Sequence, residues 1–314
     1  MRVVGVDEFG GPRALRIFDV PSPEPGAGQV RIRVHAATVN PTDTLFRAGA
    51  QAGNLRKAEP PYIPGMDAAG VIDALGPDND GRLAVGDRVV AIVVPTGSRG
   101  GAYAEQIVVP AVSVVKAPKD ADFAAASTLL MNALTARITL DLLGLHEGQS
   151  LAVTGAAGAY GAYVVELALA EGLRVIADAS PKDEQLVRGL GVYELVPRGD
   201  AVAIAIRELV PEGVDGLADG SLQGQLVVPA IADGGGLAVV RGWSGELDRG
   251  ITVHPVMVTT ESRNTAALER LVQQADAGLL TLRVAEVLPA SEAARAHEML
   301  EAGGVRGRLV LDFS

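Results

Sequence analysis

The feature that most constrains this chain is the stretch VTGAAGAYGAYVVELA, residues 153–168, in which glycines interrupt an apolar run. Gly155, Gly158 and Gly161 break the run, and apolar residues then resume at once with helical spacing. Glycine is needed where a strand turns sharply into a helix and where the backbone approaches a large ligand. The segment therefore predicts a strand, a tight loop and a helix, built either around a nucleotide diphosphate or as a bare turn without a ligand.

The loop matches the Gly-x-Gly-x-x-Gly pattern of dinucleotide-binding folds imperfectly, because Ala156 stands at the first glycine position. In such a loop the middle glycine lets a pyrophosphate approach the backbone, and the third lets the helix pack on its strand. Free N–H groups at the start of the helix then bind the phosphates. The predicted cofactor-binding loop comprises Gly155, Ala156, Ala157, Gly158, Ala159, Tyr160 and Gly161.

Strand-like and helix-like segments alternate around this loop. SLAVTG at 150–155 reads as a strand, 159–172 as a helix that Gly172 closes, and LRVIAD at 173–178 as a second strand. The alternation continues as far as residue 252. This pattern predicts an α/β fold of the Rossmann type, a doubly wound parallel sheet with helices on both faces.

The end of the second strand bears on which nucleotide is bound. Asp178 would bond a ribose 2′-hydroxyl and favour NADH, whereas Ser180 and Lys182 would hold the 2′-phosphate of NADPH. Ser180 also fits a helix N-cap, with Pro181 at the first helical position. We predict NADPH as the cofactor, with Ser180 and Lys182 among its ligands and NADH as the less favoured alternative.

The two ends of the chain show a different pattern of residues. Residues 1–118 form short β-branched runs separated by Pro and Gly, which is typical of an antiparallel, barrel-like unit. The tail adds strands and amphipathic helices and ends on the strand-like RLVLDF. We therefore predict that 1–119 and 253–314 together form a catalytic and substrate domain, which encloses a nucleotide-binding domain of residues 120–252.

Composition excludes several partners. The formal net charge of −11 opposes binding to nucleic acid or to an anionic membrane, which needs clustered Lys and Arg. The start MRVVGVDEFGG has neither the basic nor the apolar region of a signal peptide, and no uninterrupted apolar segment has the length of a membrane span. We predict a cytoplasmic protein whose partner is a small-molecule substrate.

The metal-ligating residues are few. The chain has no cysteine, which excludes disulfides, thiolate catalysis and Cys-ligated metal sites. Its four histidines are scattered without a paired spacing. We therefore expect no metal.

Several separate motifs occur in one order along essentially the whole chain. They are TVNPTD, IPGMDAAGVI, GGAYAEQIVVP, LLMNALTA, the glycine loop and RAHEMLEAGGVRGRLVL. In these motifs the chain resembles the zinc-free quinone oxidoreductase branch of the medium-chain dehydrogenase/reductase superfamily. The resemblance implies a discontinuous, β-rich GroES-like catalytic domain and a Rossmann domain that binds NADPH.

The same resemblance bears on the metal. The zinc-dependent relatives of this branch carry Cys and His ligands in the segments that correspond to TVNPTD and PGMDAAG. Asn40, Met66 and Asp67 stand there in this chain. The comparison implies hydride donation to an electron-poor acceptor rather than alcohol oxidation, in which a metal polarises the alkoxide.

The resemblance also implies site residues. The catalytic set is Asn40, Asp43 and Thr135, of which Asn40 and Asp43 would line the cleft. Further cofactor contacts would come from Thr128, Asn132, Arg241, Gly242, Trp243 and Arg308, the last reaching the cofactor phosphates. The alternatives are a turn role for Asn40, which precedes Pro41, and a hydroxyl bonded to its own helix for Thr135.

No side chain is identified as an obligatory general acid. Leu45 stands where some members of the branch have a tyrosine in the cleft segment. Tyr62 and Tyr103 lie nearby in the sequence, and we assign both to packing. A quinone that accepts hydride and then a solvent proton needs no such acid, whereas stereospecific reduction of an enoyl thioester would benefit from one.

The predicted function is NADPH-dependent hydride transfer to a quinone. The alternative is an enone or enoyl reductase of natural-product or lipid metabolism, and a non-catalytic NADPH-binding protein, as among the crystallins of this family, is less favoured. The basic residues Arg47, Arg56 and Lys57 either form a solvated loop or meet an anionic substrate. The family commonly pairs nucleotide-domain sheets, so we expect a homodimer through LAVVRG and ITVHPVMV.

Overall fold

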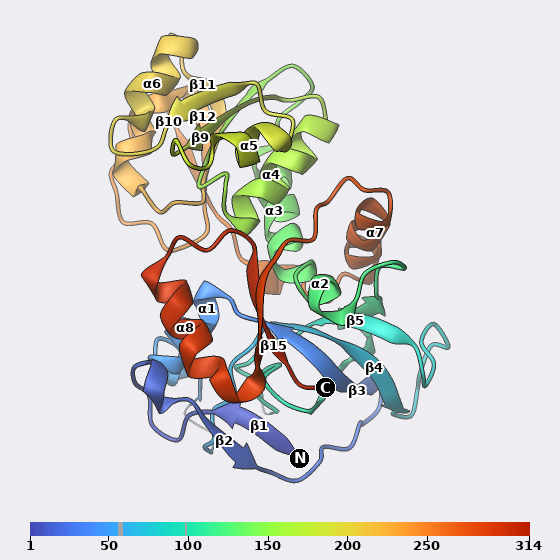
Figure 1. Cartoon of the computed structure of the whole chain (residues 1–314). Coiled ribbons are helices and arrows are strands. Elements are labelled where there is room, and N and C mark those ends of the chain that lie inside the picture. Colours follow the sequence, from blue (N-terminus) through green and yellow to red (C-terminus); the bar gives the residue numbers. More distant parts are fainter. Residues whose placement is uncertain (56–58, 98) are drawn as a thin grey trace. The chain divides into compact units, whose positions relative to one another are not determined.

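The computed structural model describes residues 1–55, 59–97 and 99–314, and the chain divides into two compact units (Figure 1). Unit 1 comprises Met1–Met131, Glu261–Ala277 and Leu282–Ser314, and unit 2 comprises Asn132–Thr260 and Gly278–Thr281. The boundaries of these units differ from those of the predicted domains. Residues 120–131 lie in unit 1, and 253–260 lie in unit 2.

Unit 2 is built on a parallel sheet of six strands, as predicted from the alternation of strands and helices. Its order is β10-β9-β8-β11-β12-β13. The strands are β8 (Ser150–Thr154), β9 (Arg174–Ala179), β10 (Glu194–Pro197), β11 (Val214–Asp219), β12 (Ile231–Val239) and β13 (Thr252–Pro255). Numbered within the sheet, this is the 3-2-1-4-5-6 order of dinucleotide-binding folds, and it confirms the Rossmann prediction.

One helix of unit 2 precedes its first strand, and the others each follow a strand of the sheet (Figure 1). The first is α3 (Leu130–Leu143), which begins in unit 1, and the others are α4 (Ala159–Ala170), α5 (Glu184–Gly189), α6 (Val202–Leu209) and the 3-10 helices η4 (Gly224–Ala230) and η5 (Val258–Thr260). Strand β8 is buried along its whole length, as a central strand covered on both faces must be. The sheet order reverses between β8 and β11, so the carboxyl ends of these strands border the crevice where such sheets bind ligands.

Unit 1 contains a seven-stranded sheet in the order β14-β15-β3-β4-β5-β7, with β6 also paired to β3. Only β14 and β15 pair in parallel; the other pairs are antiparallel. The strands are β3 (Gln29–Thr38), β4 (Asp67–Leu75), β5 (Arg88–Ile92), β6 (Gln106–Pro110), β7 (Val114–Lys116), β14 (Val284–Pro289) and β15 (Arg308–Asp312). Because β15 pairs with β3, the C-terminal strand and the N-terminal segment share one sheet.

The remaining elements of unit 1 are two short strands and several helices. β1 (Arg2–Gly5) and β2 (Arg16–Asp19) pair with each other. The helices are α1 (Pro41–Arg47), α2 (Phe123–Ser127), α7 (Thr265–Asp276) and α8 (Ala293–Ala302), with 3-10 turns η1 (Pro12–Ala14), η2 (Ala52–Leu55), η3 (Ala111–Ser113) and η6 (Ala290–Glu292). Apolar residues from β1, β3, β4, β5, β15 and α8 make one core, and it includes the buried Tyr103.

One stretch bears on the expectation that no uninterrupted apolar segment has the length of a membrane span. Phe123–Leu143 is long and apolar enough by length and composition, with a mean hydropathy of 1.2. However, 78% of its 18-residue apolar window is buried inside the structure. It also consists of two helices, α2 and α3, and such burial is typical of core helices.

Candidate functional site

The glycine loop at the carboxyl end of β8 requires glycine for steric reasons. Gly155 has a φ of +72°, and a Cβ there would lie 2.9 Å from the carbonyl carbon of Gly220. A Cβ on Gly161 would lie 2.3 Å from the carbonyl oxygen of Gly155. Both contacts are impossible for any larger residue without movement of the backbone, so these glycines bring the start of α4 against the end of β8.

Helix α4 begins at this loop without a side chain that caps it. Gly158 is the N-cap residue and offers no side-chain acceptor to the first N–H groups of the helix. These groups are available to an anion, as at other phosphate-binding helix starts. Ala156 and Ala157 are buried, and Ala159 is half-buried. The Tyr160 hydroxyl bonds the Thr139 hydroxyl at 2.8 Å, and burial raises the pKa of Tyr160.

Asp178, near the end of β9, contacts the loop directly. Its Oδ1 accepts a hydrogen bond from the Ala156 N–H at 3.0 Å. Its Oδ2 is buried and has no hydrogen-bond partner among the described residues, and the Arg198 Nε lies 3.9 Å away. Burial raises the pKa of Asp178, while the Ala156 N–H and the Arg198 charge oppose that rise. Sequence reasoning missed Arg198, which follows β10 and donates its N–H to the Ala179 carbonyl.

The residues expected at the 2′-phosphate lie just beyond β9. The Ser180 hydroxyl donates to the Asp183 carboxylate at 2.5 Å, and Lys182 is exposed. The prediction that Ser180 is a helix N-cap is wrong, because α5 begins at Glu184 and its N-cap is Asp183. A separate turn, closed by the Asp183 N–H on the Ser180 carbonyl, precedes the helix.

The carboxyl ends of β8 and β11 are joined by side chains. The Thr154 hydroxyl donates to Asp219 at 2.7 Å, and Asp219 also accepts the N–H groups of Gln223 and Gly224. This carboxylate therefore shapes the loop after β11. Sequence reasoning missed it, although an acid at the end of an apolar strand was a usable signal. After β12, the expected cofactor residues Arg241 and Gly242 are exposed, and Trp243 is half-buried.

A second polar cluster lies inside unit 1, at the predicted catalytic residues. The Asn40 amide donates to Asp67 Oδ2 at 3.0 Å and accepts from the Arg308 guanidinium at 2.6 Å. Arg308 also lies 3.4 Å from Asp67 Oδ2, and all three side chains are buried. Asp67 Oδ1 accepts the Met131 N–H at 2.9 Å, near the start of α3. Burial raises the pKa of Asp67, and the Arg308 charge opposes that rise.

Asp43 closes the turn that begins α1. Its Oδ2 accepts the Asn40 N–H at 2.8 Å, which is one half of a capping box, and its Oδ1 accepts the Gly65 N–H at 3.1 Å. The carboxylate therefore ties the Asn40 turn to the segment before β4. Burial raises the pKa of Asp43 to about 7, against the lowering effect of these N–H donors.

A chain of polar side chains leads away from Asp43. The Tyr103 hydroxyl lies 3.3 Å from Asp43 Oδ2 and 3.1 Å from His297 Nε2, and Arg47 Nη1 lies 3.4 Å from His297 Nδ1. Arg47 also donates to the Glu301 carboxylate at 2.6 Å. Burial raises the pKa of Tyr103 well above its usual value, whereas burial and the Arg47 charge lower the pKa of His297 to about 3.

These contacts correct two expectations. Arg47 is buried among Gly10, His297 and Glu301, so it belongs neither to a solvated basic loop nor to a free substrate contact. Tyr103 does more than pack, because its hydroxyl bonds Asp43. Arg56 and Lys57, the other two basic residues of that loop, lie outside the described residues.

The other predicted residues have the following positions. The Thr128 hydroxyl donates to the Ala125 carbonyl at 2.7 Å, one turn back along the chain. Asn132 and Thr135 lie three residues apart on α3, hence on one face, and both are largely buried. Arg308, which the family resemblance assigns to the cofactor phosphates, has its guanidinium against Asn40 and Asp67 instead.

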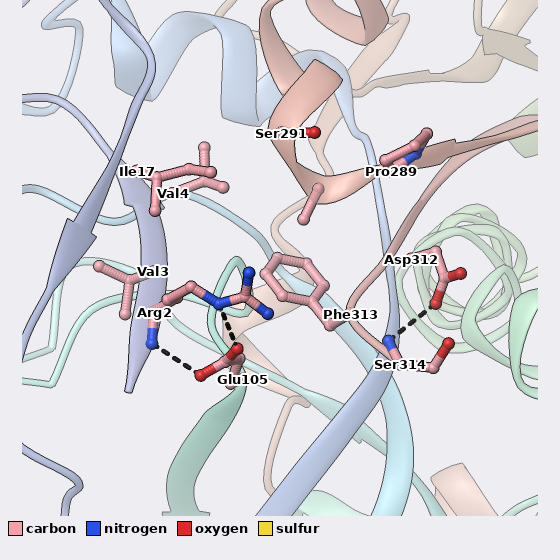
Figure 2. Close-up of a pocket in the computed structure, with 11 residues that line it drawn as sticks. Arg2, Val3, Val4, Ile17, Glu105, Pro289, Ser291, Asp312, Phe313 and Ser314 are labelled. Carbon is pink, nitrogen blue, oxygen red and sulfur yellow. Dashed lines mark hydrogen bonds and ion pairs between the residues drawn. The ribbon is translucent and has the colours of Figure 1, made fainter.

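Unit 1 also contains a pocket of about 210 Å³ (Figure 2). Its lining comes from β1, β2 and the C-terminal segment, with the Arg2–Glu105 ion pair and the Phe313 ring on its wall (Figure 2). It is smaller than the usual range for ligand sites, about 300–1,000 Å³. It contains none of the predicted catalytic or cofactor residues.

Comparisons with known proteins agree with this architecture. Residues 26–119 match the model of the alcohol dehydrogenase GroES-like domain, and residues 190–311 match that of a zinc-binding dehydrogenase. Human quinone oxidoreductase is 30% identical over 335 residues, which cover 99% of this chain and 97% of the human protein.

Two solved structures are similarly close. A mycobacterial protein complexed with NADPH is 29% identical with a TM-score of 0.85, covering 99% of each chain. An NAD-dependent alcohol dehydrogenase is also 29% identical, with a TM-score of 0.85 and 99% of each chain covered. Together with the GroES-like and Rossmann folds, these likenesses show that the chain is an oxidoreductase belonging to the quinone oxidoreductase family of the medium-chain dehydrogenase/reductase superfamily.

Proposed function

We propose that this oxidoreductase uses NADPH to reduce a quinone, or another acceptor with an activated carbon–carbon double bond, without a metal. The observation that carries the proposal is the loop at the carboxyl end of β8, beside the point where the sheet order reverses. At Gly155, Gly158 and Gly161 no side chain covers the backbone, and α4 begins without a capping side chain. A pyrophosphate fits such a helix start.

The choice of NADPH rests on charge at the end of β9. Asp178 alone would favour the ribose hydroxyls of NADH, but Arg198 approaches the same carboxylate to 3.9 Å and is partly exposed. A guanidinium there offsets the acidic charge and suits a 2′-phosphate, together with Lys182. The Asp183 carboxylate that holds Ser180 acts against this choice, so we assign the main phosphate contact to Arg198 rather than to Ser180.

Zinc does not fit the residues of unit 1, although one matched family model is described as a zinc-binding dehydrogenase. Asn40 and Asp67 both contact the guanidinium of Arg308, and its positive charge repels a metal ion. The chain has no cysteine, and the described residues hold no group of three His, Asp or Glu side chains suited to a metal.

When bound, NADPH would supply the chemistry of the proposed reaction, a hydride with its two electrons for the acceptor. Asp43 then provides the proton that the resulting anion needs, because its pKa of about 7 lets the carboxyl hold a proton near neutral pH. Asp43 would end this step as a carboxylate and, because its side chain is fully buried, would regain a solvent proton through neighbouring groups rather than by direct contact with water. The Asn40 amide is engaged by Asp67 and Arg308, so we assign Asn40 to positioning the turn.

The test is the loss of reduced-nicotinamide absorbance with purified protein. NADPH and NADH are compared against a benzoquinone, a naphthoquinone, an alkyl enone and a crotonyl thioester. We expect turnover with NADPH and a quinone, and a preference for NADPH that falls at least tenfold in Arg198→Ala. Turnover only with the enone or thioester would make this chain an enoyl-type reductase. NADPH binding with no turnover in any arm would favour a binding protein.

A matched control separates the phosphate contact from general damage. Arg188 lies on α5, the helix that follows β9, and its guanidinium donates to the Tyr193 carbonyl. Arg188→Ala should leave the ratio of NADPH to NADH activity unchanged. An unchanged ratio in Arg198→Ala would show that Arg198 does not contact the 2′-phosphate.

The cytoplasmic location expected from the sequence stays a prediction.

A further inference from the structure

Three buried side chains of unit 1 have no part in the proposed reaction, yet they form a continuous chain to Asp43. Arg47 Nη1 lies 3.4 Å from His297 Nδ1, and His297 Nε2 lies 3.1 Å from the Tyr103 hydroxyl. That hydroxyl lies 3.3 Å from Asp43 Oδ2. All four side chains are almost completely buried, with exposed fractions of 3% for Arg47 and 0% for the others.

The chemistry of Arg47 fixes the direction of every hydrogen bond in this chain. A guanidinium only donates, so His297 Nδ1 must accept and the ring proton must sit on Nε2. The Tyr103 oxygen therefore accepts from His297, and its own proton points to Asp43 Oδ2. The opposite direction would set a ring N–H of His297 against an N–H of Arg47 and leave both buried donors without an acceptor.

We propose that Arg47, His297 and Tyr103 are positioning residues that keep the Tyr103 hydroxyl donating to Asp43 and so set how tightly Asp43 holds its proton. Helix α8, which carries His297, thereby acts on the turn that begins α1. The consequence for turnover rests on the proposed function, which assigns the reaction's proton to Asp43. The hydrogen-bond direction itself does not depend on that function.

Other charged and polar groups also face Asp43. On the side of β4 and β15, Asp67 raises the proton affinity of Asp43 and Arg308 lowers it. The N–H groups of Asn40 and Gly65 stabilise the ionised form. Among the described residues, the printed hydrogen bonds of the Tyr103 hydroxyl go to Asp43 and His297 and to none of these four groups, so they provide a background against which a change in that hydrogen bond is measured.

The experiment follows the ¹³C signal of the Asp43 carboxyl by NMR during a pH titration of the full chain, with Asp43→Asn to assign the signal. Tyr103→Phe removes one donor to the charged form, so the Asp43 midpoint should move up by about one pH unit. Arg47→Met should move it in the same direction, because His297 can then carry its proton on Nδ1 and accept from Tyr103. The double variant should match Tyr103→Phe alone.

The control is Glu301→Gln. Glu301 bonds Nη2 of Arg47 and is partly exposed, so this change leaves the donor to His297 in place. The midpoint in Glu301→Gln should equal that of the wild type. An unmoved midpoint in Tyr103→Phe overturns the proposal, and so does an Arg47→Met midpoint that stays at the wild-type value. Tyr103→Phe keeps the test decisive if Arg47→Met does not fold.

Kinetics of NADPH oxidation distinguish this proposal from the proposed function. If the midpoint of the pH profile for kcat follows the NMR midpoint in Tyr103→Phe, both stand. If the NMR midpoint moves and the kinetic midpoint does not, the positioning chain stands and Asp43 is not the proton source.

Discussion

Gly161 lets helix α4 pack closely against the end of β8, because glycine has only a hydrogen atom in place of a side chain. The approach of α4 to the end of β8 leaves no room for a methyl group, since a Cβ would lie 2.3 Å from the Gly155 carbonyl oxygen. Relief requires the helix to move away from the loop that we assign to the pyrophosphate. Stability and cofactor binding should therefore suffer together.

Gly161→Ala should lower the free energy of unfolding by about 1–3 kcal/mol and weaken NADPH binding by tenfold or more. Gly189→Ala is the matched control, because a Cβ on Gly189 at the end of α5 meets no atom within 4 Å. Urea unfolding and an NADPH titration measure the two effects. Equal results for both variants would contradict the steric argument.

Asp43 and His297 affect stability in opposite directions as pH changes. The folded-state pKa of Asp43 is raised from 3.8 to about 7, so the folded chain holds a proton that the unfolded chain releases. Its contribution is full below the unfolded pKa and is lost as pH rises through about 7. The pKa of His297 is lowered from 6.5 to about 3, so its contribution is lost as pH falls below 6.5.

The prediction compares wild type with Asp43→Asn, which removes the carboxyl and leaves His297 in place. The stability of the wild type relative to this variant should decrease as pH rises from about 5 to about 8. Urea unfolding across this range gives the difference directly. A difference that stays constant over this range would mean that Asp43 is ionised throughout and that its N–H donors outweigh burial.

At the scale of elements, the Asp67–Arg308 pair joins β4 to β15 and holds the start of α3. Asp67 accepts the Met131 N–H, and Arg308 reaches Asn40 before α1. A buried pair of this kind adds little net stability compared with apolar residues, but a single remaining partner is a costly unpaired charge. The two side chains should therefore be strongly coupled.

Asp67→Asn should lower the free energy of unfolding by about 3–5 kcal/mol, because it leaves the Arg308 charge buried without its counter-ion. Removing both charges in Asp67→Asn with Arg308→Met should cost less than the two single changes added together. A double-mutant cycle by urea unfolding measures this coupling. Additive losses would show that the pair does not interact.

At the scale of the whole molecule, β13 is the outer strand of the unit 2 sheet, and among the described residues its one neighbouring strand is β12. Thr252 on this strand and Met257 just beyond it are exposed, the latter to 60%. An open edge of this kind is suited to pairing with a second copy about a two-fold axis. The homodimer that we predict from the sequence would use it, with LAVVRG forming the end of the adjacent strand.

Light scattering after size exclusion should give about twice the chain mass of 32.3 kDa. Thr252→Asp should shift the mass toward the monomer, because two like charges would then face each other across the axis. A wild-type mass of one chain would end the dimer hypothesis. A dimer that Thr252→Asp leaves intact would move the interface away from β13.

The sequence by itself determined the architecture and the glycine loop of this protein. Gly155 and Gly161 predict a strand-to-helix turn because steric limits on the backbone are local, and strand and helix periods are visible in any apolar stretch. Alternation of those periods predicts the parallel sheet of unit 2. Asn40 and Asp43 were predicted only through the family resemblance, and their role in the reaction stays a prediction.

Only the tertiary structure decided what the buried charges do. Arg47, Tyr103 and His297 are far apart in the sequence, and no local pattern indicates that they meet Asp43. From the sequence, one interpretation placed Arg47 in a solvated basic loop. In the structure it contacts His297 and Glu301 of α8. Polar contacts inside a core depend on which distant segments pack together, and so do the pKa values that burial shifts. For this physical reason, the fold of this chain could be predicted from its sequence, whereas the hydrogen bonds between its buried side chains could not.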